Sequence, residues 1–246
     1  MDHGQGQTLP VEAGQRRPTY EEIAQVIECP QLHPTITDDE VIRACRMARE
    51  YRFAALLVKP TDVELAARHL GDSETAIAAP VGFPDGMSTT AAKLYEGRDL
   101  VRRGAKEIDF TLNIGKMLGR QFQYVEMELL QMAKSCAESG ARLKVDLAAR
   151  YLNRDLKIIA LKICKRVEAQ FAGIEAHADD LALLLPMAKD RIGLKIVTNV
   201  PSLQEVLALH ESGARRMACT NAASILEEFR SRLAAEEKAA GESSTS

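Results

Sequence analysis

The sequence predicts a single-domain α/β protein folded as a closed (β/α)₈ barrel, the TIM barrel architecture. Two observations carry this prediction: short apolar segments alternate with amphipathic segments of helical period, and the alternation repeats about eight times along the chain. The length of 246 residues matches the size at which eight such units form one domain. An open doubly wound sheet is the alternative, but that fold usually carries a G-x-G-x-x-G turn, and the sequence has none.

Eight segments have the length and apolar character of buried strands. They lie at 26–29, 54–58, 76–83, 107–112, 143–147, 170–174, 193–197 and 215–219. Parallel strands that are covered on both faces read as nearly continuous apolar runs. We therefore expect these segments to run in the same direction and to be joined by helical crossovers.

Seven amphipathic segments lie between these strands. They occupy 38–51, 62–70, 89–103, 121–139, 153–166, 178–189 and 202–212. Two of them start with a capping-box pattern, T-D-D-E at 37–40 and T-D-V-E at 61–64, in which each end bonds an amide of the first turn. Gly104, Gly140 and Gly213 stand where helices are expected to end.

The two ends of the chain differ in composition from the middle. Residues 1–18 are polar and rich in Gly, Gln and Arg, which predicts a flexible N-terminal arm. Residues 19–236 form the predicted barrel, and 237–246 form a predicted disordered C-terminal tail. No linker divides the middle of the chain, so one domain is expected.

Composition excludes several classes of function. Hydrophobic residues make up 46% of the chain, charged residues 27%, and the net charge is −3, which argues against a nucleic-acid surface. The N-terminus lacks the pattern of a signal peptide, and no window reaches the roughly 18–20 apolar residues of a membrane span. The 5 cysteines form no C-x-x-C pattern, which predicts reduced thiols in a cytoplasmic protein, and scattered histidines predict no metal site.

One charged residue interrupts each of two predicted strands. Asp109 lies in K-E-I-D-F-T-L-N, and Lys195 lies in G-L-K-I-V-T-N. In a barrel, alternate strand residues point into the centre, and functional groups gather at the carboxyl ends of the strands. Because a buried carboxylate is costly unless it is paired, we expect Asp109 and Lys195 to meet there as a proton relay. A purely structural ion pair, or side chains that point outwards, is the alternative.

Several motifs together resemble the deoxyribose-phosphate aldolase family. They are V-G-F-P-D-G at 81–86, A-A-K-L-Y-E at 91–96, G-A-K-E-I-D-F-T-L-N at 104–113, Y-V-E at 124–126 and L-K-V…Y-L at 143–152. The resemblance implies a cytoplasmic class I aldolase, without metal or cofactor, that reversibly cleaves 2-deoxyribose 5-phosphate to glyceraldehyde 3-phosphate and acetaldehyde. It also implies that Asp109 and Lys195 move protons beside a substrate held as a Schiff base, and that the protein is a homodimer.

The chain departs from the family pattern at the sixth strand. The family carries its Schiff-base lysine there, whereas this chain has Gly173, and no lysine occurs between Arg166 and Ala188. The loops at 198–202 and 218–222 also lack the glycines with which the family binds phosphate. We therefore expect the family reaction to be altered or weakened. Either the chemistry has moved to other residues, or the barrel is a non-catalytic binding or regulatory protein.

Other residues are candidates for relocated chemistry. Lys59 ends the second strand, and either Lys59 or Lys195 is a candidate to form the imine; the alternative for Lys59 is a solvated loop lysine. Glu175 and His177 form a candidate acid/base pair, or a helix cap, and Arg150 adds charge at the rim. The polar residues that follow strands seven and eight are candidate ligand contacts: Asn199, Ser202, Thr220 and Asn221. The expected ligand is a small aldehyde or a phosphorylated sugar.

Overall fold

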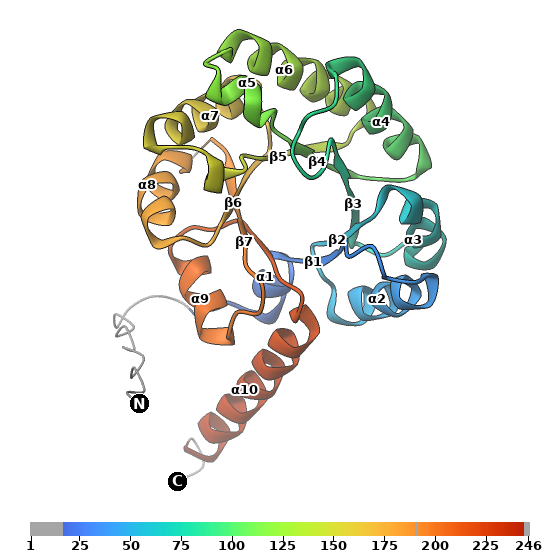
Figure 1. Ribbon diagram of the computed structural model, residues 1–246. Helices are drawn as coiled ribbons and strands as arrows, with labels where there is room; N and C mark the ends of the chain where they lie inside the picture. The colour runs from blue at the N-terminus through green and yellow to red at the C-terminus, as the bar shows by residue number, and fades with distance from the viewer. Residues whose placement is uncertain (1–16, 190, 244–246) are drawn as a thin grey trace, which may run out of the picture.

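The computed structural model describes residues 17–189 and 191–243 and contains a closed barrel of eight parallel strands inside a ring of helices (Figure 1). The strands follow one another around the barrel in sequence order, and the last pairs with the first. This arrangement confirms the predicted fold class. Among the described residues, no helix is long and apolar enough to cross a membrane.

All eight strands lie where the apolar runs predict them. They are β1 (Ile27–Gln31), β2 (Ala55–Val58), β3 (Ala76–Val81), β4 (Glu107–Thr111), β5 (Arg142–Asp146), β6 (Phe171–Glu175), β7 (Gly193–Val197) and β8 (Arg216–Ala218). Their ends differ from the predicted ranges by a few residues, because apolar residues continue into the adjoining loops.

The seven predicted helices are present, together with two five-residue helices and a long C-terminal helix. The helices are α1 (Tyr20–Ala24), α2 (Asp38–Tyr51), α3 (Val63–Leu70), α4 (Thr90–Arg103), α5 (Ile114–Leu118), α6 (Phe122–Ser139), α7 (Arg154–Arg166), α8 (Ala178–Ala188), α9 (Leu203–Glu211) and α10 (Ala222–Ser243), with 3₁₀ turns η1 (Pro60–Asp62) and η2 (Ala149–Tyr151). The sequence pattern did not indicate α1 or α5, because five residues span too few turns to show a period.

Local chemistry sets the helix starts. At α2 the Glu40 carboxylate accepts hydrogen bonds from the Thr37 amide at 2.7 Å and its hydroxyl at 2.8 Å, which completes one predicted capping box. The capping box predicted at 61–64 is wrong. Pro60 opens a 3₁₀ turn that contains Thr61, so the residue that precedes α3 is Asp62.

The C-terminal end also differs from the prediction. Because α10 continues to Ser243, the segment 237–243 is helical rather than disordered. The first turns of α10 bury Phe229 against the barrel, whereas its later turns project away from it (Figure 1). In this exposed part, Nε of Arg232 lies 3.1 Å from Oε1 of Glu236, and this ion pair stabilises the helix. The predicted arm at 1–18 lies almost entirely outside the described residues.

Two motifs of the sequence, V-G-F-P-D-G and A-A-K-L-Y-E, hold the β3–α4 region together. Lys93 on α4 is fully buried, and its ammonium group donates to Glu128 on α6 at 3.0 Å and to the Thr111 carbonyl at 3.1 Å. Gly82 leaves room for this lysine, since a Cβ atom there would lie 2.7 Å from Cε of Lys93. The two motifs therefore maintain the packing of α4 and α6 on the barrel.

The strands pack against two separate apolar clusters, one outside the barrel and one inside it. The main apolar core lies between the strands and the surrounding helices and contains outward-facing strand residues such as Leu56, Ile108 and Ile174. Inside the barrel, β2 and β3 contribute a separate, small apolar cluster of Ala55, Leu57, Ala76 and Ala78. The remaining interior space is available to longer side chains from the other strands.

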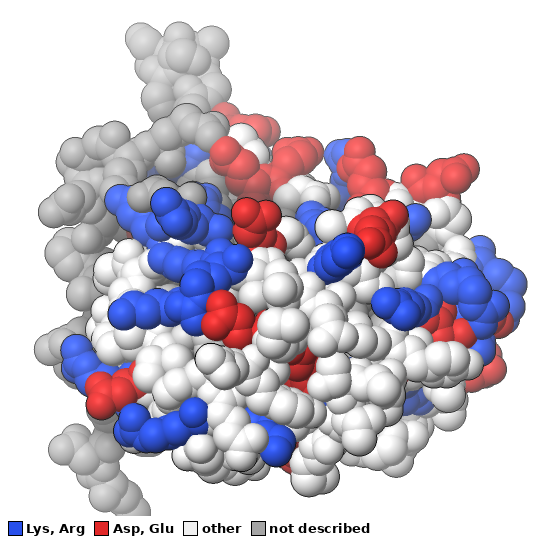
Figure 2. All heavy atoms as spheres, turned by 90° about the horizontal axis from the view of Figure 1, so that it is seen from above, with Lys and Arg blue, Asp and Glu red and all other residues white. Residues whose placement is uncertain are grey.

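One face of the helical ring is poor in charge. The face formed by α4, α5 and α6 lies at the top of Figure 1, and its centre is largely uncharged where it faces the viewer in Figure 2. Large apolar side chains are exposed on these helices: Tyr95, Leu118, Tyr124, Met127 and Leu130. A contiguous surface of this kind is typical of a protein contact.

Gly86 provides a test of the packing between the β3–α4 loop and the end of β4. Its φ angle is +67°, and a Cβ atom would lie 2.1 Å from the Leu112 carbonyl oxygen. We expect Gly86→Ala to lower the free energy of unfolding by at least about 3 kcal/mol, because overpacking adds to left-handed strain. Gly140 is the matched control: its φ is +69° and its ψ is 15°, in the left-handed region, and no atom lies within 4 Å of the added Cβ. Gly140→Ala should cost only about 1–2 kcal/mol in urea unfolding, and equal losses in the two variants would show that the Leu112 contact is not the cause.

Candidate active site

Six charged side chains fill one side of the barrel interior. None of these six residues is more than 6% exposed. They are Glu28 on β1, Glu107 and Asp109 on β4, Lys144 on β5, Lys195 on β7 and Arg216 on β8. Each faces inward because its neighbours in the strand face the helices. Three carboxylates oppose three cations, so the cluster buries no net charge, which is the condition under which buried ions are tolerated.

Asp109 and Lys195 meet inside the barrel, as the sequence predicts. The Lys195 ammonium contacts Oδ2 of Asp109 and lies 2.5 Å from Oε1 of Glu28. Burial alone would lower the pKa of Lys195, but the carboxylates of Asp109 and Glu28 outweigh it and raise that pKa above its usual value. Lys195 is therefore an ammonium ion at neutral pH. It can donate hydrogen bonds, but in this state it cannot attack a carbonyl carbon.

Lys144 completes the cluster, and sequence reasoning missed it. Its ammonium group contacts Oε2 of Glu28 and lies 3.1 Å from Glu107 and 3.7 Å from Asp109. The signal was available, because Lys144 interrupts the apolar run L-K-V-D-L just as Lys195 interrupts G-L-K-I-V. Asp109 thus lies between two ammonium groups.

A lower layer closes the cluster towards the amino ends of the strands. Arg216 binds Glu107 through two hydrogen bonds of 3.1 Å and lies over the Phe171 ring at 4.9 Å. Burial raises the pKa of Glu107, but Lys144 and Arg216 outweigh that effect and leave it lowered. Glu107 is therefore a carboxylate, and the pair of Arg216 and Glu107 supports the charged groups that lie above it.

Gly173 leaves a gap in the side chains at the level of Lys195. It pairs with Asp146 of β5 on one side and with Lys195 of β7 on the other. A methyl group on Gly173 would lie 3.5 Å from Cα of Asp146 and 3.8 Å from Cδ of Lys195, which are ordinary contacts. A Cβ atom is therefore tolerated at this position between Asp146 and Lys195.

Asp146 is a second residue that sequence reasoning missed. It ends β5, is half-buried, and its Oδ1 accepts a hydrogen bond from the Ala148 amide at 2.9 Å. Burial raises its pKa and the Asp109 carboxylate raises it further, against the Ala148 amide and Lys195, so that the pKa is about 6. A carboxyl group that titrates this close to neutrality is suited to proton transfer.

Lys59 lies apart from this cluster. It follows β2, as predicted, and is half-buried. Its ammonium group donates to the Ile36 carbonyl at 2.6 Å and lies 3.3 Å from Asp62. These partners hold it against the loop that follows β1, and none of its recorded contacts involves Asp109 or Lys195.

Glu175 and His177 are not in contact through their side chains among the described residues. Glu175 ends β6 and forms an ion pair with Arg150 at the rim. His177 is exposed and precedes α8 without a side-chain capping bond. The predicted acid/base pair is therefore not assembled, and Glu175 serves to hold Arg150.

The polar loops after β7 and β8 bind each other. Thr220 donates from its amide at 3.1 Å and its hydroxyl at 2.8 Å to the Asn199 carbonyl. The Asn221 side chain donates to the Pro201 carbonyl at 2.9 Å. The structure thus brings the predicted ligand contacts Asn199, Thr220 and Asn221 together. The Thr220 hydroxyl and the Asn221 Nδ2 group bond across the loops, whereas Oδ1 of Asn221 is buried without a hydrogen-bond partner among the described residues.

Ser202, the fourth predicted ligand contact, caps α9. The Glu205 carboxylate accepts hydrogen bonds from the Ser202 amide at 2.7 Å and its hydroxyl at 2.8 Å. These hydrogen bonds lower the pKa of Glu205. Phosphate commonly binds at the start of a helix, but at α9 the Glu205 carboxylate already accepts the hydrogen bonds that Ser202 would donate to phosphate.

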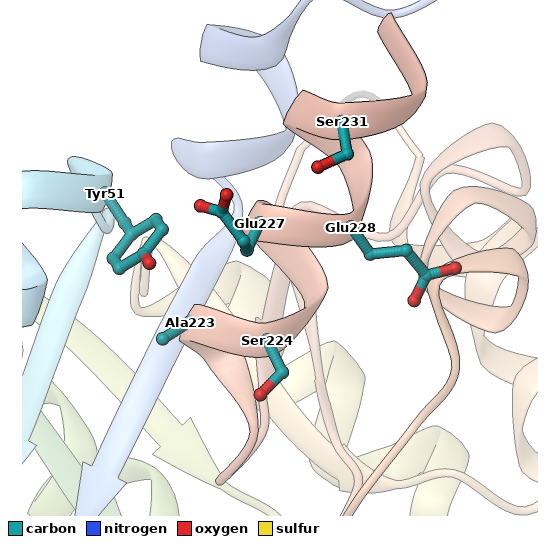
Figure 3. Close-up of a pocket in the computed structure, with 6 residues that line it drawn as sticks. All are labelled: Tyr51, Ala223, Ser224, Glu227, Glu228 and Ser231. Atoms are coloured by element: carbon teal, nitrogen blue, oxygen red, sulfur yellow. The ribbon is translucent and has the colours of Figure 1, made fainter. Parts of the chain in front are cut away.

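The described residues offer no other centre of comparable chemistry. No group of His, Cys, Asp and Glu within them has the arrangement of a metal site. A surface pocket of about 450 Å³ lies between α2 and α10 (Figure 3). Its lining contains no member of the charged cluster: Tyr51, Ala223, Ser224, Glu227, Glu228 and Ser231.

Comparison with known proteins gives consistent relatives, although no protein-family model matches the chain. The deoxyribose-phosphate aldolase of Caldanaerobacter subterraneus subsp. tengcongensis is 32% identical over 216 residues, covering 85% of this chain and 94% of that protein. The same-named enzyme of Halalkalibacterium halodurans is 31% identical over 217 residues, covering 85% and 96%.

Solved structures agree with these relatives. The structure of "QR15, an Aldolase" superimposes with a TM-score of 0.80 at 26% identity, covering 86% of this chain and 97% of that one. The deoxyribose phosphate aldolase of Aeropyrum pernix shares the fold, with a TM-score of 0.76 at 23% identity over 87% and 93% of the two chains.

Removing the Lys195 ammonium tests the charge balance of the cluster. We expect Lys195→Met to lower the free energy of unfolding by about 3–5 kcal/mol at neutral pH, because Asp109 and Glu28 lose a buried partner. The deficit should shrink as the pH falls, since the folded variant then binds protons at these carboxylates. Lys59→Met is the control, with an expected loss of about 1 kcal/mol or less. Similar losses in the two variants, measured by urea unfolding, would show that Lys195 is not held by charge.

Proposed function

The chain belongs to the deoxyribose-phosphate aldolase family, and we propose that it binds a small aldehyde or a phosphorylated sugar at the barrel mouth and carries out aldol chemistry without forming an imine on its own lysine. The observation that carries this proposal is Gly173, which leaves the position between Asp146 and Lys195 without an amine. Among the lysines near the mouth, Lys195 is held charged by two carboxylates, and Lys59 is bound to the loop after β1.

A charged Lys195 supports a different route to the same bond cleavage. Its ammonium group donates a hydrogen bond to the carbonyl oxygen of the substrate and stabilises the negative charge that develops there. Asp109 keeps this group protonated. An iminium ion is a stronger electron sink than a hydrogen-bonded carbonyl, so we expect cleavage of 2-deoxyribose 5-phosphate to be slow.

The second candidate function is a non-catalytic binding or regulatory protein. The same absence of a lysine at Gly173 favours it, as does the internal capping of α9 by Glu205 at a place where phosphate would bind. Direct measurement of 2-deoxyribose 5-phosphate cleavage separates the two candidates. Binding without turnover supports the second, and turnover supports the first.

Location and assembly complete the proposal. All 5 cysteines are free and buried, as expected for a cytoplasmic protein, and burial raises the pKa of each cysteine thiol. We infer a homodimer that buries the exposed apolar side chains of α4, α5 and α6.

The dimer is tested by placing a charge on this face. Met127, on α6, is 53% exposed, and Met127→Glu should convert the dimer to a monomer in sedimentation velocity because it buries an unpaired carboxylate. A monomeric wild-type protein, or a dimer unaffected by Met127→Glu, would contradict this interface.

Borohydride trapping tests the absence of an imine. After incubation with acetaldehyde or 2-deoxyribose 5-phosphate and reduction, intact mass should show no adduct on the wild-type protein. Gly173→Lys should gain one adduct at position 173, because it returns an amine to β6 at a position where a Cβ atom has only ordinary contacts. Gly173→Met, of similar length but without an amine, is the matched control and should remain unmodified. A stoichiometric wild-type adduct on Lys59, Lys144 or Lys195 would contradict the proposal.

A further inference from the structure

The geometry points to Asp146 as the catalytic group that exchanges a proton with the substrate carbon next to the carbonyl group, first as a base and then as an acid. This inference rests on the proposed function. It adds the residue that takes the hydroxyl proton in cleavage and gives it to the substrate carbon, a role that neither Asp109 nor Lys195 fills, since each is held by the other.

The position of Asp146 places it across the gap from Lys195. In the register of the barrel, Asp146 pairs with Gly173, and Gly173 pairs with Lys195. A Cβ atom on Gly173 would lie 3.5 Å from Cα of Asp146 and 3.8 Å from Cδ of Lys195, so these two residues flank a strand position that carries no side chain. A carbonyl compound that lies over Gly173 would have Asp146 on one side and Lys195 on the other.

The Asp146 carboxyl group is oriented but not fully used. Oδ1 accepts the hydrogen bond from the Ala148 amide, and Ala148 holds a left-handed turn with φ of +49° directly after β5. Among the described residues no hydrogen bond to Oδ2 of Asp146 is recorded, and the side chain is partly open to solvent at the mouth. One oxygen thus fixes the direction of the group while the other remains available to a substrate proton.

The charges that face Asp146 come from three neighbouring strands. Asp109 on β4 and Glu175 on β6 raise its pKa, whereas Lys195 on β7 lowers it; burial is the largest effect, and the result is about 6. Thr111, its register partner on β4, is uncharged, and Arg150 at the rim is paired with Glu175. Asp146 is therefore mainly ionised at neutral pH, yet basic enough to hold a proton once it has taken one.

The proton transfers balance over the reaction. In cleavage, the Asp146 carboxylate takes the proton of the β-hydroxyl group, the carbon–carbon bond breaks, and its electron pair forms an enolate whose oxygen accepts a hydrogen bond from Lys195. The Asp146 carboxyl group then gives that proton to the enolate carbon, which restores the carboxylate. The last step is reversible, so Asp146 can also remove a methyl proton from acetaldehyde and later return a different one. Hydrogen exchange between acetaldehyde and solvent therefore requires no carbon–carbon bond cleavage.

The test measures deuterium uptake into the methyl group of acetaldehyde in D₂O, followed by NMR against a protein-free blank. The wild-type rate should rise with pH through an inflection near 6. Asp146→Asn should reduce the rate about 100-fold and remove the inflection. Asp155→Asn, which alters an exposed carboxylate on α7, should stay within about twofold of the wild-type rate.

A stability readout and a second variant guard against a loss of folding. Because the folded-state pKa of Asp146 is raised from 3.8, its favourable effect on stability is present at low pH and is lost as the pH rises through about 6. The amide side chain introduced by Asp146→Asn does not ionise, so the free energy of unfolding of this variant does not fall in this way. The variant should therefore be more stable than the wild type above about pH 6. In Asp146→Ala, added formate should restore exchange by about tenfold, because it supplies the missing carboxylate.

The outcomes separate this inference from the proposed function. Exchange that depends on Asp146, without cleavage of 2-deoxyribose 5-phosphate, supports Asp146 and rejects the aldolase reaction on that sugar. Cleavage together with exchange that is unchanged in Asp146→Asn rejects Asp146 and leaves the proposed function intact. Absence of wild-type exchange, or exchange without an inflection near pH 6, overturns the role of Asp146 whether or not the variants fold.

Discussion

The ion pair between Lys195 and Asp109 is the constraint on which the barrel interior depends. Two lysines and an arginine are buried beside three carboxylates, and each ion is tolerated only because the others are present. The same arrangement sets the chemistry. An ammonium group with two carboxylate neighbours stabilises negative charge on a substrate oxygen, but it does not become a nucleophile.

The shape of the interior follows from the sizes of its side chains. On β2 and β3 the inward residues include Ala55, Ala76 and Ala78, which are short enough to leave the centre to the long charged side chains of the opposite strands. Gly173 then removes the side chain from β6 at the level where Asp146 and Lys195 face each other. The polar space at the mouth is thus produced by small residues as much as by the charged ones.

Much of this architecture could be predicted from the sequence. The strands and longer helices have strong periodicity, and the Asp109 and Lys195 contact follows from two charges that interrupt apolar strands. Lys144 was missed, although it interrupts its strand in the same way. Pairing Asp109 with Lys195 alone does not reveal that the buried carboxylates Glu28 and Glu107 also need a cation. Asp146 was missed because its properties depend on neighbours from three other strands, and strand pairing, unlike periodicity, is not local.

Other differences also arise from tertiary contacts. The sequence shows that Glu175 and His177 are two residues apart, but it does not show that Arg150 approaches Glu175 from the end of β5. Likewise, polar residues at 198–202 and 218–222 were assigned to a ligand, whereas the Thr220 hydroxyl and the Asn221 Nδ2 group bond to the opposite loop. Polar residues at a strand end therefore predict a functional rim only after the bonds between loops are known.

The protonation state of Lys195 is the central claim, and the most direct measurement is ¹⁵N NMR of lysine side chains, with the Lys195 signal assigned by comparison with Lys195→Arg. Burial lowers the pKa of Lys195, but Asp109 and Glu28 raise it by more, so its nitrogen should remain an ammonium ion up to and beyond the usual lysine pKa of 10.5. A Lys195 nitrogen that loses its proton near neutral pH would contradict this claim, because a neutral amine beside Gly173 would restore imine chemistry.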